Sequence, residues 1–130
     1  MIRILDTNAY VQLKRGHEGA ANLVRSSSQL HLSIIVLGEL CFGFHDGSRR
    51  DENLAELDEF LAHPFVSIAY LTRTTADRFG RVASALKKAG TPIPTNDIWL
   101  AAQTLELGAE LITFDSHFHH IPGLVVQIPR

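Results

Sequence analysis

The chain has 130 residues, which is the length of one ordinary domain. Hydrophobic residues make up 45% of it and charged residues 20%, a globular composition that excludes a disordered, collagen-like or coiled-coil chain. The formal net charge is −2, from 12 Lys and Arg against 14 Asp and Glu, whereas nucleic-acid binders are usually basic. We therefore expect a single domain over residues 1–130.

Cysteine content and hydropathy limit the compartment in which the chain works. Cys41 is the only cysteine, so neither an intrachain disulfide nor a cysteine-based zinc site can form. The first residues lack the layout of a signal peptide, and no apolar run approaches the roughly 20 residues that a membrane span needs. We expect a cytoplasmic protein with no membrane partner.

Short apolar strands alternate with helices along the sequence. In chain order we predict a strand at 2–5, a helix at 18–25, a strand at 30–35 that runs into the apolar segment 36–42, a helix at 51–62, a strand at 65–69, a helix from a cap at Thr74 or Thr75 to Ala89, a helix at 97–107 after a cap at Thr95 or Asn96, and strands at 110–113 and 124–128. Buried strands alternating with helices are typical of a parallel sheet covered on both faces. We predict an α/β fold of three layers, α/β/α, with a mainly parallel central sheet.

Four acidic residues occupy positions where such a sheet binds ligands, at the carboxyl ends of its strands. Asp6 directly follows the first strand and Asp115 follows the strand at 110–113, while Glu39 and Asp97 are predicted in the first turns of their helices. Each acid alone is also explained as a helix cap or as a partner of a helix dipole. Together, four converging acids repel one another unless a cation is present. A cluster of oxygen ligands without His or Cys suits Mg²⁺ or Mn²⁺ better than zinc.

Segments 4–8, 93–102, 111–118 and 121–126, with the lone Glu39 between them, resemble the PIN-domain ribonucleases. Within that family they are most similar to the VapC toxins of bacterial toxin–antitoxin pairs. The resemblance covers essentially the whole chain in order and spacing. It implies a PIN-like fold and an RNA endonuclease that acts as the toxin of a type II system.

The resemblance also implies roles for individual residues. The acidic quartet is matched by Asp6, Glu39, Asp97 and Asp115, of which Asp6, Asp97 and Asp115 are the expected metal ligands. The supporting positions, which orient carboxylates by hydrogen bonds, are matched by Asn8, Asn96 and Thr113. Some members carry a further acid just after the last Asp; this chain has Ser116 and His117 there, which argues against a second firmly held metal.

The implied chemistry is hydrolysis of an RNA phosphodiester bond by a water that Mg²⁺, or Mn²⁺, activates. Three arginines, Arg73, Arg78 and Arg81, are candidates for phosphate contact, as are the pairs at 14–15 and 49–50. Ordinary surface charge remains the alternative for all of them. The implied partners are a cognate VapB-like antitoxin, the RNA substrate and a second copy of the chain in a homodimer.

Three histidines follow the last acid of the quartet. His117, His119 and His120 do not have the spacing of a standard zinc site, so we expect RNA contact or plain surface and not metal binding. Two other functions stay open. One is a non-catalytic PIN-like module that binds RNA or protein. The other is a phosphatase or dehalogenase with a nucleophilic Asp6, although the second acid it needs is replaced here by Asn8.

Overall fold

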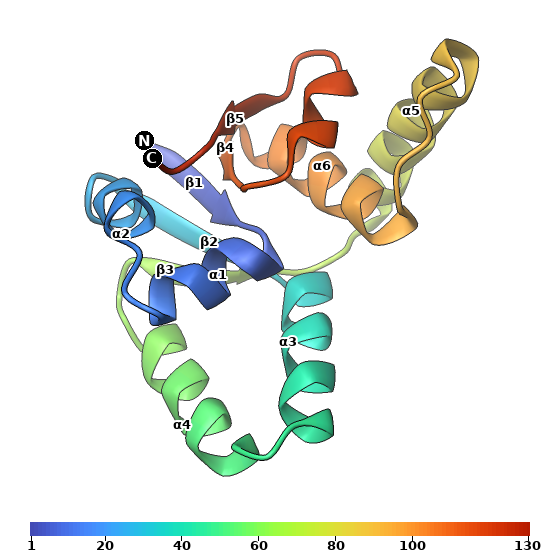
Figure 1. Cartoon of the computed structure of the whole chain (residues 1–130). Helices are drawn as coiled ribbons and strands as arrows, with labels where there is room; N and C mark the ends of the chain where they lie inside the picture. The colour runs from blue at the N-terminus through green and yellow to red at the C-terminus, as the bar shows by residue number, and fades with distance from the viewer.

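Five parallel strands form one sheet in the computed structural model, which describes residues 1–130 (Figure 1). The elements are β1 (Ile2–Leu5), α1 (Thr7–Lys14), α2 (Glu18–Arg25), β2 (Gln29–Ser33), α3 (Ile34–Asp46), α4 (Arg50–Leu61), β3 (Val66–Ala69), α5 (Arg73–Ala89), α6 (Thr95–Leu107), β4 (Glu110–Ile112), the 3₁₀ helix η1 (Ser116–His120) and β5 (Val125–Gln127). The strand order is β3-β2-β1-β4-β5, and every pair is parallel. The predicted α/β class and parallel sheet are confirmed.

The helices cover the sheet from both sides (Figure 1). Helices α5 and α6 lie on one side, and α1, α2 and α4 lie on the other. The chain therefore winds outward from β1 through β2 to β3, crosses over, and returns to place β4 on the other side of β1. A reversal of this kind opens a crevice at the carboxyl ends of the two strands that flank it, here β1 and β4. None of the helices has both the length and the apolar run that crossing a bilayer requires.

The core forms on both faces of the central strands, as expected for a covered parallel sheet. Six apolar strand side chains have no solvent exposure: Ile4, Leu5, Leu30, Leu32, Leu111 and Ile112. On one face, the ring of Tyr10 packs edge-on against Phe60 at 5.3 Å between centroids and joins α1 to α4. On the other, Phe79 of α5 stacks on Trp99 of α6 at 4.2 Å. These contacts hold α1, which follows Asp6, and α6, which contains Asp97.

In the first half of the chain one helix was not predicted and one predicted strand end is wrong. Helix α1 was not predicted, because its short, polar sequence has little apolar periodicity. The strand expected to reach Ile35 ends at Ser33, whose hydroxyl accepts the backbone N–H of Ile35 at 3.0 Å and caps α3. Helix α3 therefore begins at Ile34, and Glu39 lies in its second turn, not in its first.

Two predicted caps are also wrong, while both helix C-termini are confirmed. Thr72, not Thr74 or Thr75, caps α5, and Thr75 completes the cap by accepting the backbone N–H of Thr72. Helix α6 begins directly after Pro94 and has no side-chain cap. Gly90 and Gly108 end α5 and α6 at φ values of 69° and 62°, a region that glycine enters without steric cost.

Candidate active site

The crevice between β1 and β4 receives acidic residues from both strands. Asp6 is the residue after β1, and its backbone N–H donates to Ile112 O of β4 at 3.1 Å. Asp115 follows β4 and caps η1. Since β1 and β4 are direct neighbours, these two carboxylates reach the same edge of the sheet.

Asp6 is the most firmly held of the acids, with only 9% of the residue exposed. Its Oδ1 accepts the backbone N–H of Ala9 at 2.7 Å. Its Oδ2 accepts the hydroxyl of Thr113, which is fully buried. The Thr113 hydroxyl oxygen in turn accepts the backbone N–H of Asp115 at 3.0 Å. Thr113 thus connects the two acids of the sheet edge.

Two helices contribute the other acids. Asp97 lies in the first turn of α6, where a carboxylate is favoured by the helix dipole. Glu39 comes from α3, and its Oε1 accepts the hydroxyl of Thr7 at 2.6 Å. Thr7 is the first residue of α1, directly after Asp6. The first turn of α1 therefore binds Asp6 through the Ala9 N–H and orients Glu39 through the Thr7 hydroxyl.

The acids lie close enough for their charges to influence one another. Burial is the largest cause that raises the pKa of Asp6, and the charges of Asp97 and Asp115 raise it further, against its bonds to Thr113 and Ala9. Burial likewise raises the pKa of Asp97, and the charges of Glu39 and Asp115 add to it, against the stabilising contact with His117. The quartet predicted from the sequence is therefore one electrostatic cluster. A bound cation would relieve this repulsion.

His117 lies between two of these acids. Its Nε2 is 2.9 Å from Asp97 Oδ2, and its Nδ1 is 2.8 Å from Asp115 Oδ1. His117 is therefore not the plain surface residue that was one of its two expected roles, while contact with RNA stays a prediction. His119 and His120, by contrast, are exposed. The group whose ligand atoms lie within 4.8 Å of one another is Asp97, Asp115 and His117, so the cluster is not made of oxygens alone.

The predicted supporting asparagines make no side-chain hydrogen bond to the acids. Asn8 borders a shallow hollow together with Asp6 and Asp115. Asn96 borders another, beside Glu39. Of the three predicted supporting residues, only Thr113 donates a hydrogen bond to one of these carboxylates.

The three predicted RNA-binding arginines lie on α5 and are exposed. Arg81 is paired with Asp77 at 2.8 Å. Arg73 follows the cap of α5 at Thr72, whose hydroxyl contacts Glu106, and Glu106 lies roughly 14 Å further along α6 than Asp97. None of these three arginines borders a hollow that is also lined by an acid of the quartet.

A different basic group flanks the acidic cluster. The hollow between α1, α3 and α4 contains Thr7 and Glu39 and is bordered by Lys14, Arg15 and Arg49. The Lys14 ammonium lies 4.8 Å from the centroid of the Phe60 ring, which keeps the lysine at the rim of this hollow.

Comparisons with known proteins agree with this geometry. The family model for the PIN domain matches residues 3–124. The chain belongs to the PIN-domain family. Ribonuclease VapC1 of Haemophilus influenzae (strain R2866) is 30% identical over 98% of this chain and 97% of its own length. Ribonuclease VapC2 of Rickettsia felis is 27% identical over the same shares.

Solved structures extend the similarity to the fold. VapBC2 from Rickettsia felis, bound to a DNA fragment from its promoter, matches with a TM-score of 0.86 at 26% identity, over 98% of both chains. VapBC-1 from nontypeable Haemophilus influenzae matches with a TM-score of 0.86 at 30% identity, over 98% of this chain and 97% of that one. Within the PIN-domain family the chain therefore groups with the VapC ribonucleases, as its sequence motifs predicted.

Two residues of this PIN domain were missed as site residues. Thr7 directly follows Asp6, but its partner Glu39 is distant in the sequence and was assigned to the wrong helical turn. His117 is two residues after Asp115, and its partner Asp97 lies 20 residues earlier, on α6. The only local signal was that His117 occupies a place where some family members carry an acid.

Removing the Thr113 hydroxyl tests how far this PIN domain depends on the orientation of Asp6. We expect Thr113→Val to lower the rate of RNA cleavage roughly 10- to 100-fold, because a carboxylate that loses its orienting hydrogen bond is mispositioned. Thr104→Val is the matched control, since Thr104 is equally buried and its hydroxyl bonds only to Leu100 O at 2.8 Å. Equal rates for both variants would show that Thr113 does not position Asp6.

The raised pKa of Asp97 has a consequence for stability in cation-free buffer. The unfolded chain ionises this carboxyl near 3.8 and the folded protein at higher pH, so between the two values the folded state binds more protons. The free energy of unfolding therefore falls as pH rises through this window. We expect Asp97→Asn to be more stable than the wild type at pH 7 in EDTA, and the difference to shrink toward pH 4. Urea titrations of both proteins measure this difference in the free energy of unfolding. A difference that grows as the pH is lowered would contradict the prediction.

Proposed function

We propose that this chain is a Mg²⁺-dependent endoribonuclease, with Mn²⁺ as a possible replacement, and that it acts as the toxin of a toxin–antitoxin pair. The observation that carries the proposal is that the charges of Asp6, Glu39, Asp97 and Asp115 act on one another beside the carboxyl edge of the sheet. Membership of the VapC ribonucleases supports RNA as the substrate.

The donor set fits a divalent cation. Carboxylate oxygens are the ligands that Mg²⁺ prefers, and burial with mutual repulsion raises the pKa of Asp6 and of Asp97. We assign the cation to Asp6, Asp97 and Asp115, with Glu39 beside them. When bound, it activates water as a nucleophile and polarises a phosphate oxygen.

The chain's own residues orient the reaction. Thr113 and the Ala9 N–H hold the Asp6 carboxylate in one position. Thr7 engages Oε1 of Glu39 and leaves Oε2 to accept the proton of the attacking water. That water forms a bond to phosphorus while the bond to the 3′-oxygen breaks, and the leaving 3′-oxygen takes up a proton from solvent, so the products carry a 5′-phosphate and a 3′-hydroxyl.

RNA needs cationic contacts near these acids. Lys14, Arg15 and Arg49 border the hollow that contains Glu39, and we favour them over Arg73, Arg78 and Arg81 as the phosphate-binding residues. Substitution of Lys14 and Arg15 should weaken RNA binding at all sequences alike and reduce its salt dependence.

The relatives indicate the protein partners. VapBC and FitAB complexes share this fold, so we propose a VapB-like antitoxin and, as a second partner, another copy of the chain. Phe42 is 72% exposed on α3 and borders the other hollow beside Glu39, the one that Asn96 also lines, where an apolar antitoxin segment would cover it. We also propose that the activity is cytoplasmic, where RNA is available, and that it resides in a single PIN domain over residues 1–130.

Incubation of the purified protein with total RNA, followed by mapping of the ends, tests the function. We expect discrete cuts that leave 5′-phosphates in Mg²⁺ buffer, and none with Asp6→Ala. If the wild type binds RNA but does not cut it, the result would favour a non-catalytic binding module over an enzyme. Covalent labelling of Asp6 in place of RNA cleavage would favour the phosphatase or dehalogenase chemistry.

A further inference from the structure

The imidazole of His117 occupies a defined place inside the acidic cluster. It lies 2.9 Å from Asp97 Oδ2 through Nε2 and 2.8 Å from Asp115 Oδ1 through Nδ1. The side chain is 27% exposed, so it is partly enclosed by the protein.

Three contacts of the short helix η1 hold this ring in position. Asp115 caps η1 by accepting the backbone N–H of His117 at 3.1 Å. The next residue, Phe118, is 1% exposed and anchors η1 in the core. The His117 ring lies against the Phe118 ring at 4.8 Å between centroids. The imidazole is therefore placed by the fold and not by chance rotation at the surface.

We propose that His117 is a nitrogen ligand of the catalytic cation, so that the site combines imidazole and carboxylate donors. This inference rests on the proposed cation-dependent function. Asp97, Asp115 and His117 each offer a ligand atom, and these atoms lie within 4.8 Å of one another. Neighbouring ligands at right angles around a cation, with bonds of about 2.1 Å, are separated by about 3.0 Å. The 2.9 Å between His117 Nε2 and Asp97 Oδ2 matches that spacing. Nδ1, 2.8 Å from Asp115 Oδ1, is then the ring nitrogen that donates its N–H to a carboxylate, as metal-bound histidines usually do.

An imidazole ligand changes which cation the site prefers. Mg²⁺ binds oxygen ligands, whereas imidazole nitrogen favours transition metals, with affinity rising from Mn²⁺ toward Zn²⁺. The site should therefore bind Mn²⁺ more tightly than Mg²⁺, by a margin that depends on His117. The ring thus determines cation choice for the carboxylates that surround it.

Pulsed electron paramagnetic resonance on the Mn²⁺-loaded full chain tests the nitrogen bond directly. We expect echo modulation from a coordinated ¹⁴N nucleus in the wild type and in His119→Gln, and its loss in His117→Gln. His119 is the matched control because it is an exposed histidine of the same short helix. Incorporation of ¹⁵N-histidine should replace the ¹⁴N pattern and so assign it to a histidine.

Equilibrium titration with Mn²⁺ and Mg²⁺ gives a second readout without RNA. We expect His117→Gln to lower the ratio of Mn²⁺ to Mg²⁺ affinity roughly 10-fold, while His119→Gln leaves the ratio unchanged. A wild-type Mn²⁺ site without nitrogen modulation would overturn the proposal and leave His117 as a bridge between two carboxylates. Mg²⁺-dependent cleavage by the wild type would in that case still stand, so the two proposals fail separately.

Discussion

Asp97→Asn is expected to lower RNA cleavage by roughly 10³-fold while RNA binding is retained. The amide keeps the shape of the carboxylate but removes a charge at the start of α6, beside Glu39 and Asp115. A neutral ligand cannot hold a divalent cation as an anionic one does. Single-turnover cleavage and filter binding of the same labelled RNA measure the two effects separately.

Asp77→Asn is the matched control for this substitution. Asp77 is an exposed acid on α5, paired with Arg81 at 2.8 Å and remote from the cluster. We expect its cleavage rate to stay within about twofold of the wild type, since exposed ion pairs contribute little. Comparable losses in both variants would mean that general charge, and not the sheet-edge cluster, supports cleavage.

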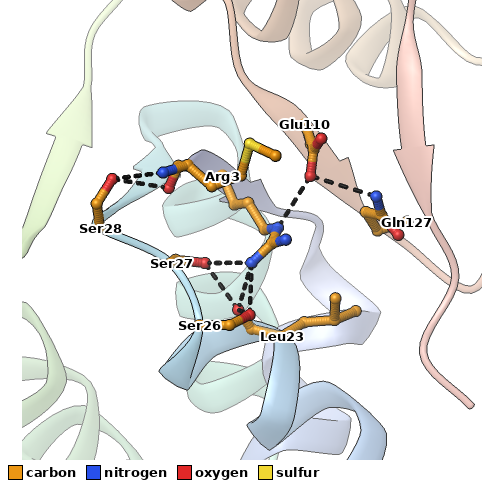
Figure 2. A network of polar contacts seen from close by, with 8 residues as sticks. Arg3, Leu23, Ser26, Ser27, Ser28, Glu110 and Gln127 are labelled. Atoms are coloured by element: carbon orange, nitrogen blue, oxygen red, sulfur yellow. Dashed lines mark hydrogen bonds and ion pairs between the residues drawn. The ribbon is translucent and has the colours of Figure 1, made fainter.

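Arg3→Met is expected to lower the free energy of unfolding by about 3–5 kcal/mol, because it leaves a largely buried carboxylate without its cation. Figure 2 shows Arg3 of β1 between Glu110 of β4 and the residues at the end of α2. Its Nε donates to Glu110 Oε1 at 3.0 Å, and its Nη1 donates to Leu23 O at 2.9 Å and to Ser26 Oγ at 2.8 Å. The side chains of Arg3 and Glu110 are 9% and 15% exposed.

Two further variants check this cause by urea unfolding. Combining Arg3→Met with Glu110→Leu should recover most of the loss, because the unpaired charge is removed as well. Arg81→Met, which breaks an exposed pair, should cost less than about 1 kcal/mol. A loss below that value for Arg3→Met, or no recovery in the double variant, would show that the pair does not stabilise the sheet.

The parts of the fold that could be predicted have local signals. The strands around Ile4 and Leu111 are short apolar runs, and Gly90 and Gly108 mark helix ends because they adopt positive φ. Helix α1 has no such signal, since its stability comes from the Asp6 cap and from packing of Tyr10 on Phe60. The start of α3 was misplaced because the β-branched Ile34 and Ile35 favour a strand by propensity, whereas Ser33 caps a helix there.

The site shows the same division between local and tertiary information. The acids could be predicted because each lies just after a strand or near the start of a helix, and parallel strands bring their carboxyl ends to one edge of the sheet. The contacts of His117 with Asp97, and of Thr7 with Glu39, join residues from separate elements. No spacing in the sequence encodes such pairs, because they depend on how helices pack across the sheet.

Removal and return of the divalent cation tests the central claim most directly. Wild-type protein and RNA are incubated in EDTA, and Mg²⁺ or Mn²⁺ is then added back in excess. We expect cleavage to stop in the chelator and to return with either cation, at the same cut sites. Cleavage that continues unchanged in EDTA would contradict a catalytic centre made of Asp6, Glu39, Asp97 and Asp115 around a cation.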